Sequence, residues 1–152
     1  MNFEDKYIKW FSEISNKDVS VAGGKGASLG EMYNNKFPVP PGFIITAQAF
    51  DFFIENVKEK IKNILIGVDY ENTEKLSRKS REIRDAIENE EMPDELKSEI
   101  LEAYKILGAE EFGGKGASAD ALNILRNSQE PIFVSVRSSA TTEDLDDSSF
   151  AG

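Results

Sequence analysis

The sequence predicts an α/β or α+β fold in which several helices surround a small sheet. Two short, apolar and partly β-branched runs, at residues 43–45 and 131–136, are typical of buried strands. Other segments of the chain carry apolar residues at helical spacing. The chain has 152 residues, of which 39% are hydrophobic and 30% are charged, so it can bury a core. We therefore expect residues 1–152 to form a single domain.

The N-terminal part predicts short elements separated by turns. Residues 7–11 are apolar and aromatic, which indicates a short strand or the end of a helix. A glycine-rich turn at residues 23–26 precedes a short helix over residues 27–35. Several prolines then exclude a helix before the strand at residues 43–45. Thr46 is expected to cap the next helix, whose apolar face is formed by Ala47, Phe50, Phe53, Ile54 and Val57.

The middle of the chain is predicted to be helical. Residues 72–89 and their flank contain opposite charges four positions apart, namely Glu71–Lys75, Glu74–Arg78, Arg81–Asp85 and Arg84–Glu88. Each pair contributes only a few tenths of a kcal/mol, so we expect this helix to dock through Leu76, Ile83, Ala86 and Ile87. Pro93 is placed as the first residue of a further helix, with an apolar stripe of Leu96, Ile100, Ala103, Tyr104 and Leu107. A short helix over residues 119–127 is expected before the strand at 131–136.

The composition excludes several kinds of chemistry. The absence of Cys removes disulfides, a thiol nucleophile and thiolate metal sites, and the absence of His removes the commonest general base and zinc ligand. The net charge of −10 argues against nucleic acid or an anionic membrane surface as a partner. Neither a signal peptide nor an apolar run of about 20 residues is visible. The expectation is a cytoplasmic protein with no membrane partner.

The hexapeptide Gly-Gly-Lys-Gly-Ala-Ser occurs twice, at residues 23–28 and 113–118. Neither copy fits the P-loop pattern, because each Lys is followed by Gly and the upstream Gly is absent. A glycine-rich turn at the start of a helix has free N–H groups that can face an anion, and Lys25 would add a positive charge there. An ordinary turn explains the same residues. Local sequence leaves both interpretations open.

Arg137 begins a hydroxyl-rich turn directly after the predicted strand at 131–136. Strand ends often present ligand-contacting side chains in α/β proteins, and a planar guanidinium suits phosphate. The following Ser138 and Ser139 offer hydroxyl donors. Alternatively, Arg137 pairs with an acidic residue and closes the turn. The nearby acidic cluster is interpreted as a helix cap rather than a magnesium site, and comprises Glu143, Asp144, Asp146 and Asp147.

Several motifs lie in order near the two ends of the chain. The first comprises Trp-Phe-Ser-Glu-Ile at residues 10–14 and Gly-Gly-Lys-Gly-Ala-Ser-Leu-Gly-Glu-Met at residues 23–32. The second is Val-Pro-Pro-Gly-Phe-Ile-Ile-Thr-Ala at residues 39–47. The third and fourth are Val-Arg-Ser-Ser-Ala-Thr-Thr-Glu-Asp-Leu at residues 136–145 and Ser-Phe-Ala-Gly at residues 149–152. Together they resemble the signatures of the phosphoenolpyruvate synthase (pyruvate, water dikinase) family.

The resemblance implies the N-terminal portion of an ATP-grasp nucleotide-binding domain. In that family a Lys of the first motif and the Arg of the third contact the phosphates of ATP, and these residues match Lys25 and Arg137. The glycine of the last motif lies over the phosphates and matches Gly152. The family converts ATP, pyruvate and water to phosphoenolpyruvate, AMP and phosphate through a phosphohistidine on a separate domain. A barrel domain handles pyruvate, and the Mg²⁺ ligands are expected beyond Gly152.

The departures from the family pattern predict a partial enzyme. The chain has no His to carry the phosphoryl group, and it stops inside the fourth motif. We expect a fragment of a longer enzyme that is inactive alone and binds ATP weakly or not detectably. A related dikinase, a rifampicin phosphotransferase and a non-catalytic structural module are the alternatives. No family motif surrounds the second hexapeptide, so Lys115 is expected in a connecting turn.

Overall fold

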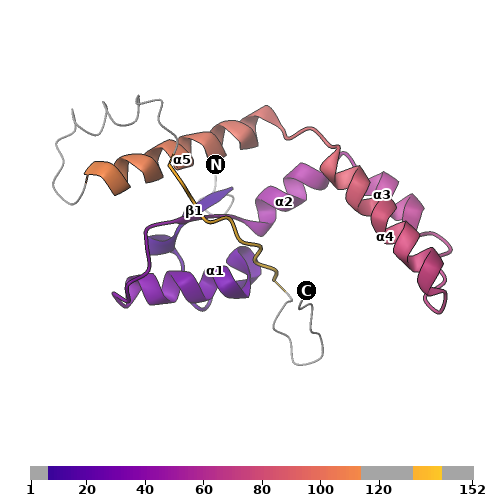
Figure 1. Ribbon diagram of the computed structural model, residues 1–152, viewed down its shortest axis with the longest axis horizontal. Helices are drawn as coiled ribbons and strands as arrows, with labels where there is room; N and C mark the ends of the chain where they lie inside the picture. The colour runs from indigo at the N-terminus through magenta and orange to yellow at the C-terminus, as the bar shows by residue number, and fades with distance from the viewer. Residues whose placement is uncertain (1–6, 114–131, 142–152) are drawn as a thin grey trace.

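The computed structural model describes residues 7–113 and 132–141, and this part of the protein has an α+β architecture (Figure 1). In the described residues, five helices and one 3₁₀ turn surround a two-stranded sheet. In chain order the elements are β1 (Ile8–Trp10), η1 (Phe11–Glu13), α1 (Val19–Asn34), β2 (Phe43–Ile45), α2 (Ala47–Ile54), α3 (Lys58–Leu65), α4 (Thr73–Glu88) and α5 (Asp94–Gly113). The expected fold class, with several helices around a small sheet, is confirmed.

The sheet joins the two apolar segments of the N-terminal part. Strands β1 and β2 are antiparallel, with Trp10 opposite Phe43 and Ile8 opposite Ile45. The rings of Trp10 and Phe43 pack edge to face with their centroids 5.5 Å apart, as cross-strand aromatic pairs commonly do. The strand predicted at 43–45 is therefore present, and residues 7–11 resolve into a strand followed by a 3₁₀ turn. The sheet lies between α1 and α5 (Figure 1).

Thr46 caps α2 as the sequence predicts. Its backbone is extended, and its hydroxyl oxygen accepts the N–H of Ala49 at 3.2 Å. Both residues are buried, so the cap provides an acceptor where water does not reach. The predicted apolar face of this helix is only partly correct, because Phe50 is half exposed while Val57 is buried at the start of α3.

We expect Thr46→Ala to lower the free energy of unfolding by about 1–2 kcal/mol, because the buried N–H of Ala49 loses its acceptor. Thr46→Ser keeps the oxygen and serves as the control, with a smaller loss. Urea denaturation of the three proteins measures the difference. An Ala variant as stable as the parent would contradict the capping role.

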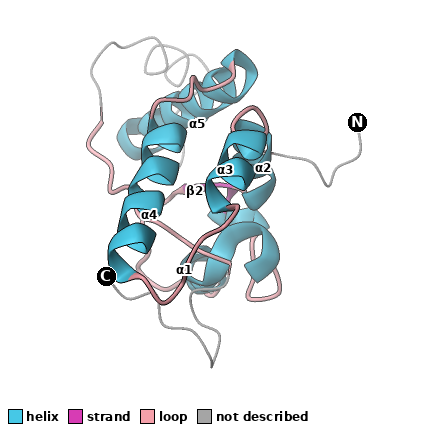
Figure 2. Ribbon diagram, turned by 90° about the vertical axis from the view of Figure 1, so that its right-hand side faces the viewer, coloured by secondary structure: helices cyan, strands magenta, loops and turns pink. Residues whose placement is uncertain are grey.

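Helices α3 and α4 form an antiparallel pair on one side of the molecule (Figure 2). The predicted helix at 72–89 is confirmed as α4, and its buried contact is Ala86. The ion pairs differ from those predicted, because Glu82 is the acidic partner of both Arg78 and Lys79, at 3.7 and 3.4 Å. One of these pairs is exposed and the other is part-buried, both lie near the surface, and such pairs contribute little to stability.

Helix α5 covers the side of the sheet opposite α1 (Figure 1). It begins one residue after Pro93, whose carbonyl accepts the N–H of Lys97. Three residues of the predicted apolar stripe are buried, namely Leu96, Ala103 and Leu107. The stripe therefore faces the core as predicted. Within the described residues, no helix combines the length and apolarity needed to cross a membrane.

Residues 132–136 do not form the strand that the sequence predicts at 131–136. Residues 132–140 have no regular secondary structure, and the side chains of Phe133 and Val136 are 101% and 90% exposed. A strand needs a neighbouring strand to complete its hydrogen bonds, and local sequence cannot supply that neighbour. Instead, Ile132 is buried near Gly108 of α5. The hydroxyl of Tyr104 donates a hydrogen bond to the backbone carbonyl of Ile132 at 2.5 Å. From there the chain passes the sheet and reaches α1, as the yellow segment in Figure 1 shows.

Candidate functional site

The first glycine-rich hexapeptide lies inside α1, where the helix is broken at one residue. Gly23 has φ 71° and ψ 168°, a combination essentially restricted to glycine, while residues on both sides are helical. The predicted turn at 23–26 is therefore wrong in extent, because the helix begins at Val19 and departs from helical geometry only at Gly23. The first turn of the second half of α1 consists of Gly24, Lys25 and Gly26.

The hydroxyl of Ser139 occupies the break in α1. It accepts the N–H of Gly26 at 2.9 Å and donates to the carbonyl of Ala22 at 2.7 Å. In an uninterrupted α-helix the N–H of Gly26 would bond directly to the carbonyl of Ala22, four residues earlier. The serine hydroxyl is thus inserted into the helical ladder, which is a recognised cause of a helix kink.

The backbone beside Ser139 also contacts the break. The N–H of Gly24 donates to the carbonyl of Ala140 at 3.1 Å. A Cβ on Gly23 would lie 2.3 Å from the Ser139 hydroxyl oxygen and 2.5 Å from its carbonyl oxygen. Only glycine allows this approach, so α1 and the segment around Ser139 can pack this closely only because residue 23 has no side chain.

These contacts correct the prediction that the N–H groups of the glycine-rich turn are free to face an anion. The N–H groups of Gly24 and Gly26 are already bonded to Ala140 and Ser139. The Ser139 hydroxyl, predicted as a donor to a ligand, donates to the protein backbone. Any phosphate role of this segment therefore depends on side chains and on other backbone groups.

An open cleft of about 270 Å³ lies beside the break. Its walls come from both segments and from the loop before α1, and are formed by Asn16, Val19, Gly24, Ala27, Ser28, Ala140 and Thr141. The volume is slightly below that of typical small-molecule pockets. Neither Lys25 nor Arg137 lines it.

The three predicted site residues, Lys25, Arg137 and Gly152, lie in different parts of the chain. Lys25 is half-buried in α1, and Arg137 is exposed on the 132–141 segment. Their two segments meet through Ser139, which the sequence does not pair with the glycines. Gly152 lies outside the described residues, as do Lys115 and the predicted helix at 119–127. Contact of these residues with phosphate stays a prediction.

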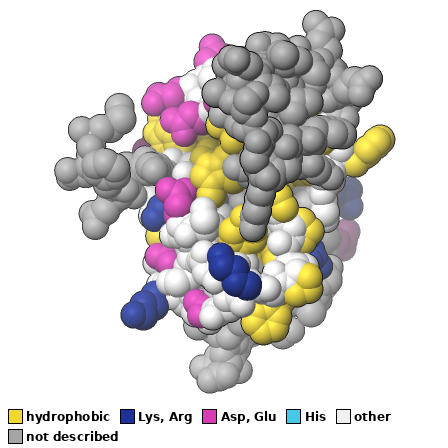
Figure 3. All heavy atoms as spheres, turned by 90° about the vertical axis from the view of Figure 1, so that its left-hand side faces the viewer, with side chains coloured by type: hydrophobic (Ala, Val, Ile, Leu, Met, Phe, Trp, Pro, Cys, Tyr) yellow, Lys and Arg dark blue, Asp and Glu magenta, His cyan; other side chains and the backbone are white. Residues whose placement is uncertain are grey.

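An acidic residue, Asp18, lies in sequence between two residues that line the cleft, Asn16 and Val19. Asp18 precedes α1, and its carboxylate accepts hydrogen bonds from the backbone N–H and the hydroxyl of Ser15, both at 2.8 Å. These bonds, the backbone one first, lower the pKa of Asp18 from its usual value. Figure 3 views the molecule from the left of Figure 1, away from the place where α1 meets the 132–141 segment, and on that face basic side chains stand apart from one another. Among the described residues, no three acidic side chains lie close enough together to hold a metal ion. The acidic cluster that begins at Glu143 lies outside the described residues.

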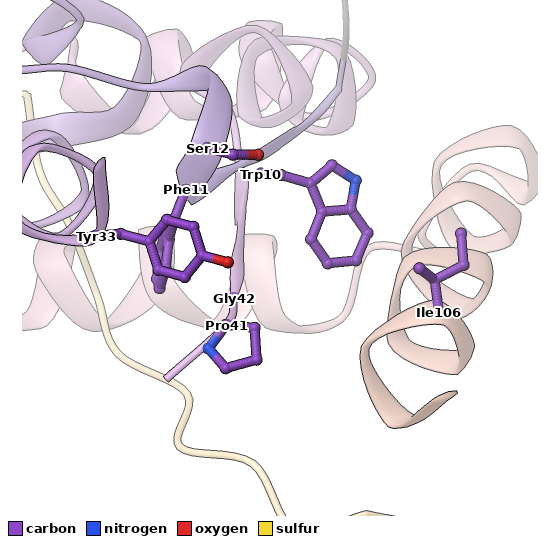
Figure 4. A pocket seen from close by; sticks show the side chains of 7 residues that line it. All are labelled: Trp10, Phe11, Ser12, Tyr33, Pro41, Gly42 and Ile106. Atoms are coloured by element: carbon purple, nitrogen blue, oxygen red, sulfur yellow. The ribbon is translucent and has the colours of Figure 1, made fainter. Parts of the chain in front are cut away.

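A second cleft, of about 240 Å³, has aromatic walls (Figure 4). Its residues come from β1, η1, α1, the loop before β2 and α5, and are Trp10, Phe11, Ser12, Tyr33, Pro41, Gly42 and Ile106. The rings of Phe11 and Tyr33 lie 6.2 Å apart, and a Cβ on Gly42 would lie 2.5 Å from the Phe11 ring. This cleft cannot be predicted from the sequence, because most of its residues are apolar and they come from distant parts of the chain.

Comparison with known proteins defines the class. Residues 19–152 match the family described as "Pyruvate phosphate dikinase, AMP/ATP-binding domain". The match includes the broken helix, the Ser139 segment and the first cleft's side chains from Val19 onward. The protein belongs to this family of nucleotide-binding domains.

Relatives of this chain carry the name of one enzyme. The chain is 46% identical over 149 residues to the "Probable phosphoenolpyruvate synthase" of Methanocaldococcus jannaschii, covering 97% of the chain and 11% of the relative. It is 38% identical over 181 residues to the "Phosphoenolpyruvate synthase" of Pyrococcus furiosus, covering 97% and 20%. It is 40% identical over 153 residues to that of Helicobacter pylori, covering 97% and 17%. The chain spans at most about a fifth of these relatives, and the expected family resemblance is confirmed.

Proposed function

We propose that this chain is the N-terminal portion of the ATP-binding domain of a phosphoenolpyruvate synthase, and that this domain is of the ATP-grasp kind. The match to an AMP/ATP-binding family supports the nucleotide, and the names of the relatives support the enzyme. One structural observation supports the location of the phosphate site. The segments of Lys25 and Arg137, far apart in sequence, are hydrogen-bonded to each other beside an open cleft.

In this proposal Lys25 and Arg137 bind the phosphates of ATP. Phosphoryl transfer depends chiefly on positioning and on neutralising the charge of the phosphates. An ammonium and a planar guanidinium supply such charges, and the guanidinium can donate two hydrogen bonds at once. Gly152 would lie over the phosphates as the last residue of the fourth motif. The family resemblance implies that the Mg²⁺ ligands lie beyond Gly152, in the remainder of the enzyme.

The acceptor chemistry belongs to other domains in this proposal. The chain contains no His, so a phosphohistidine must be supplied by another part of the enzyme. The proposed overall reaction converts ATP, pyruvate and water to phosphoenolpyruvate, AMP and phosphate, with pyruvate bound by a separate barrel domain. The 152-residue chain alone is expected to be inactive and to bind ATP weakly or not detectably. The cytoplasmic location stays a prediction.

We expect Lys25→Ala and Arg137→Ala each to weaken binding of Mg²⁺-ATP to the full-length enzyme about tenfold or more, because each removes a charge-assisted hydrogen bond to phosphate. Isothermal titration calorimetry measures the affinity, and thermal unfolding shows that the variants are folded. The matched control is Lys115→Ala, which changes the same residue in the second copy of the hexapeptide and should bind ATP normally. If Lys25→Ala and Arg137→Ala both bind like the parent enzyme, the site is assigned wrongly.

A further inference from the structure

We infer that Ser139 is a positioning residue of the nucleotide site, and that its hydroxyl sets the placement of Arg137 relative to Lys25. This inference rests on the proposed function of those two residues. It concerns a side chain whose hydroxyl hydrogen-bonds to two backbone groups of α1. Its role would therefore be exerted through its neighbours rather than through the nucleotide.

The hydroxyl satisfies both sides of the break at once. Its oxygen accepts from Gly26 and its hydrogen is donated to Ala22, so neither backbone group is left without a partner in this part-buried position. Unsatisfied buried groups of this kind are costly, which holds the serine in place. The hydroxyl thereby keeps α1 open at Gly23.

The same serine limits where the two cations can be. Lys25 is bonded in sequence to Gly26, which donates to Ser139. Arg137 is two residues before Ser139, so its Cα lies within about 7 Å of the Ser139 Cα even in a fully extended chain. The further bond from Gly24 to Ala140 fixes the direction of the segment across α1. Both cations are thus carried by one hydrogen-bonded unit.

Removing the hydroxyl should release this unit. In Ser139→Ala the N–H of Gly26 and the carbonyl of Ala22 lose their common partner. The helix can then close by forming the direct bond between them, which requires Gly23 to become helical. Closure withdraws the groups that hold the 139–140 backbone, and Arg137 is no longer held beside α1.

A double-mutant cycle on the full-length enzyme tests this role, with Mg²⁺-ATP affinity measured by calorimetry. We expect Ser139→Ala to weaken binding about tenfold in the parent enzyme but to have little effect when Arg137 is already Ala. A residue with a merely structural role would weaken binding by the same factor in both backgrounds. The matched control is Ser135→Ala, because Ser135 is exposed and lies as far before Arg137 as Ser139 lies after it.

The outcomes separate this inference from the proposed function. If Arg137→Ala and Lys25→Ala do not weaken binding, the proposed function fails. If they do but Ser139→Ala binds like the parent, or its effect multiplies with that of Arg137→Ala, only the inference on Ser139 is overturned. Should Ser139→Ala not fold, Ser139→Cys replaces it, since a thiol keeps the shape but hydrogen-bonds weakly. Loss of folding in both variants would also overturn the inference, because Ser139 would then be needed for the fold itself.

Discussion

Gly23→Ala should destabilise the chain by about 2–6 kcal/mol. The residue has φ 71° and ψ 168°, where a side chain costs about 1–3 kcal/mol. Its Cβ would also lie within 2.6 Å of three atoms of Ser139, two of them backbone atoms, and such overpacking costs about 1–3 kcal/mol more. Urea denaturation measures the loss, and the same change should weaken nucleotide binding by displacing the Ser139 segment.

The control for Gly23→Ala is Gly67→Ala. Gly67 has nearly the same φ, 69°, but no atom lies within 4 Å of the position its Cβ would take. It therefore carries the conformational cost of about 1–2 kcal/mol without the steric one. Equal losses in the two variants would mean that the close approach of Ser139 to α1 does not exist in solution.

Gly30→Ala is the second change with a large expected effect. Gly30 is buried in α1, and a Cβ there would lie 2.7 Å from the Cβ of Ile14 and 2.8 Å from its carbonyl oxygen. Ile14 is 1% exposed and cannot move aside. The alanine gains about 1 kcal/mol of helix propensity, but the clash outweighs it, and we expect a net loss of about 2 kcal/mol.

Gly108→Ala is the matched control, since Gly108 is also a glycine inside a helix. The nearest atom to its added Cβ is the γ2 methyl of Ile132, 3.3 Å away, so a shift of a few tenths of an ångström in that side chain accommodates it. This variant should be neutral or more stable by up to about 1 kcal/mol. Thermal and urea unfolding should therefore show a loss of stability for Gly30→Ala and no loss for Gly108→Ala. A Gly30→Ala variant as stable as the parent would show that Ile14 does not pack against α1 at Gly30.

The elements that the sequence predicts correctly are those determined by neighbouring residues. The run Phe43–Ile45 forms a strand and Thr46 caps the helix after it, because apolar character and capping chemistry are local. Helix α4 matches its predicted range to within one residue at each end for the same reason. The family motifs in the sequence identify the class, which the comparisons confirm.

The candidate site could be predicted only in part, because its geometry depends on contacts between distant residues. Lys25 and Arg137 can be named from the sequence, but nothing local indicates that Ser139 enters α1 at Gly23. Two adjacent glycines suggest a turn, so the sequence does not indicate that the residues from Val19 to Ala22 are already helical. The apolar run after Pro131 suggests a strand, but a strand requires a partner that sequence periodicity does not reveal.

The interruption of α1 also has a consequence for the order of folding. The hydroxyl that opens the helix comes from a residue 113 positions beyond Gly26, so this contact closes a very long loop. Helical turns form within about a microsecond, whereas contacts between distant residues form later. During synthesis α1 leaves the ribosome well before Ser139 is made. We therefore expect the helix to be continuous at first and to open at Gly23 only when Ser139 docks, which would make this joint one of the last parts of the chain to form.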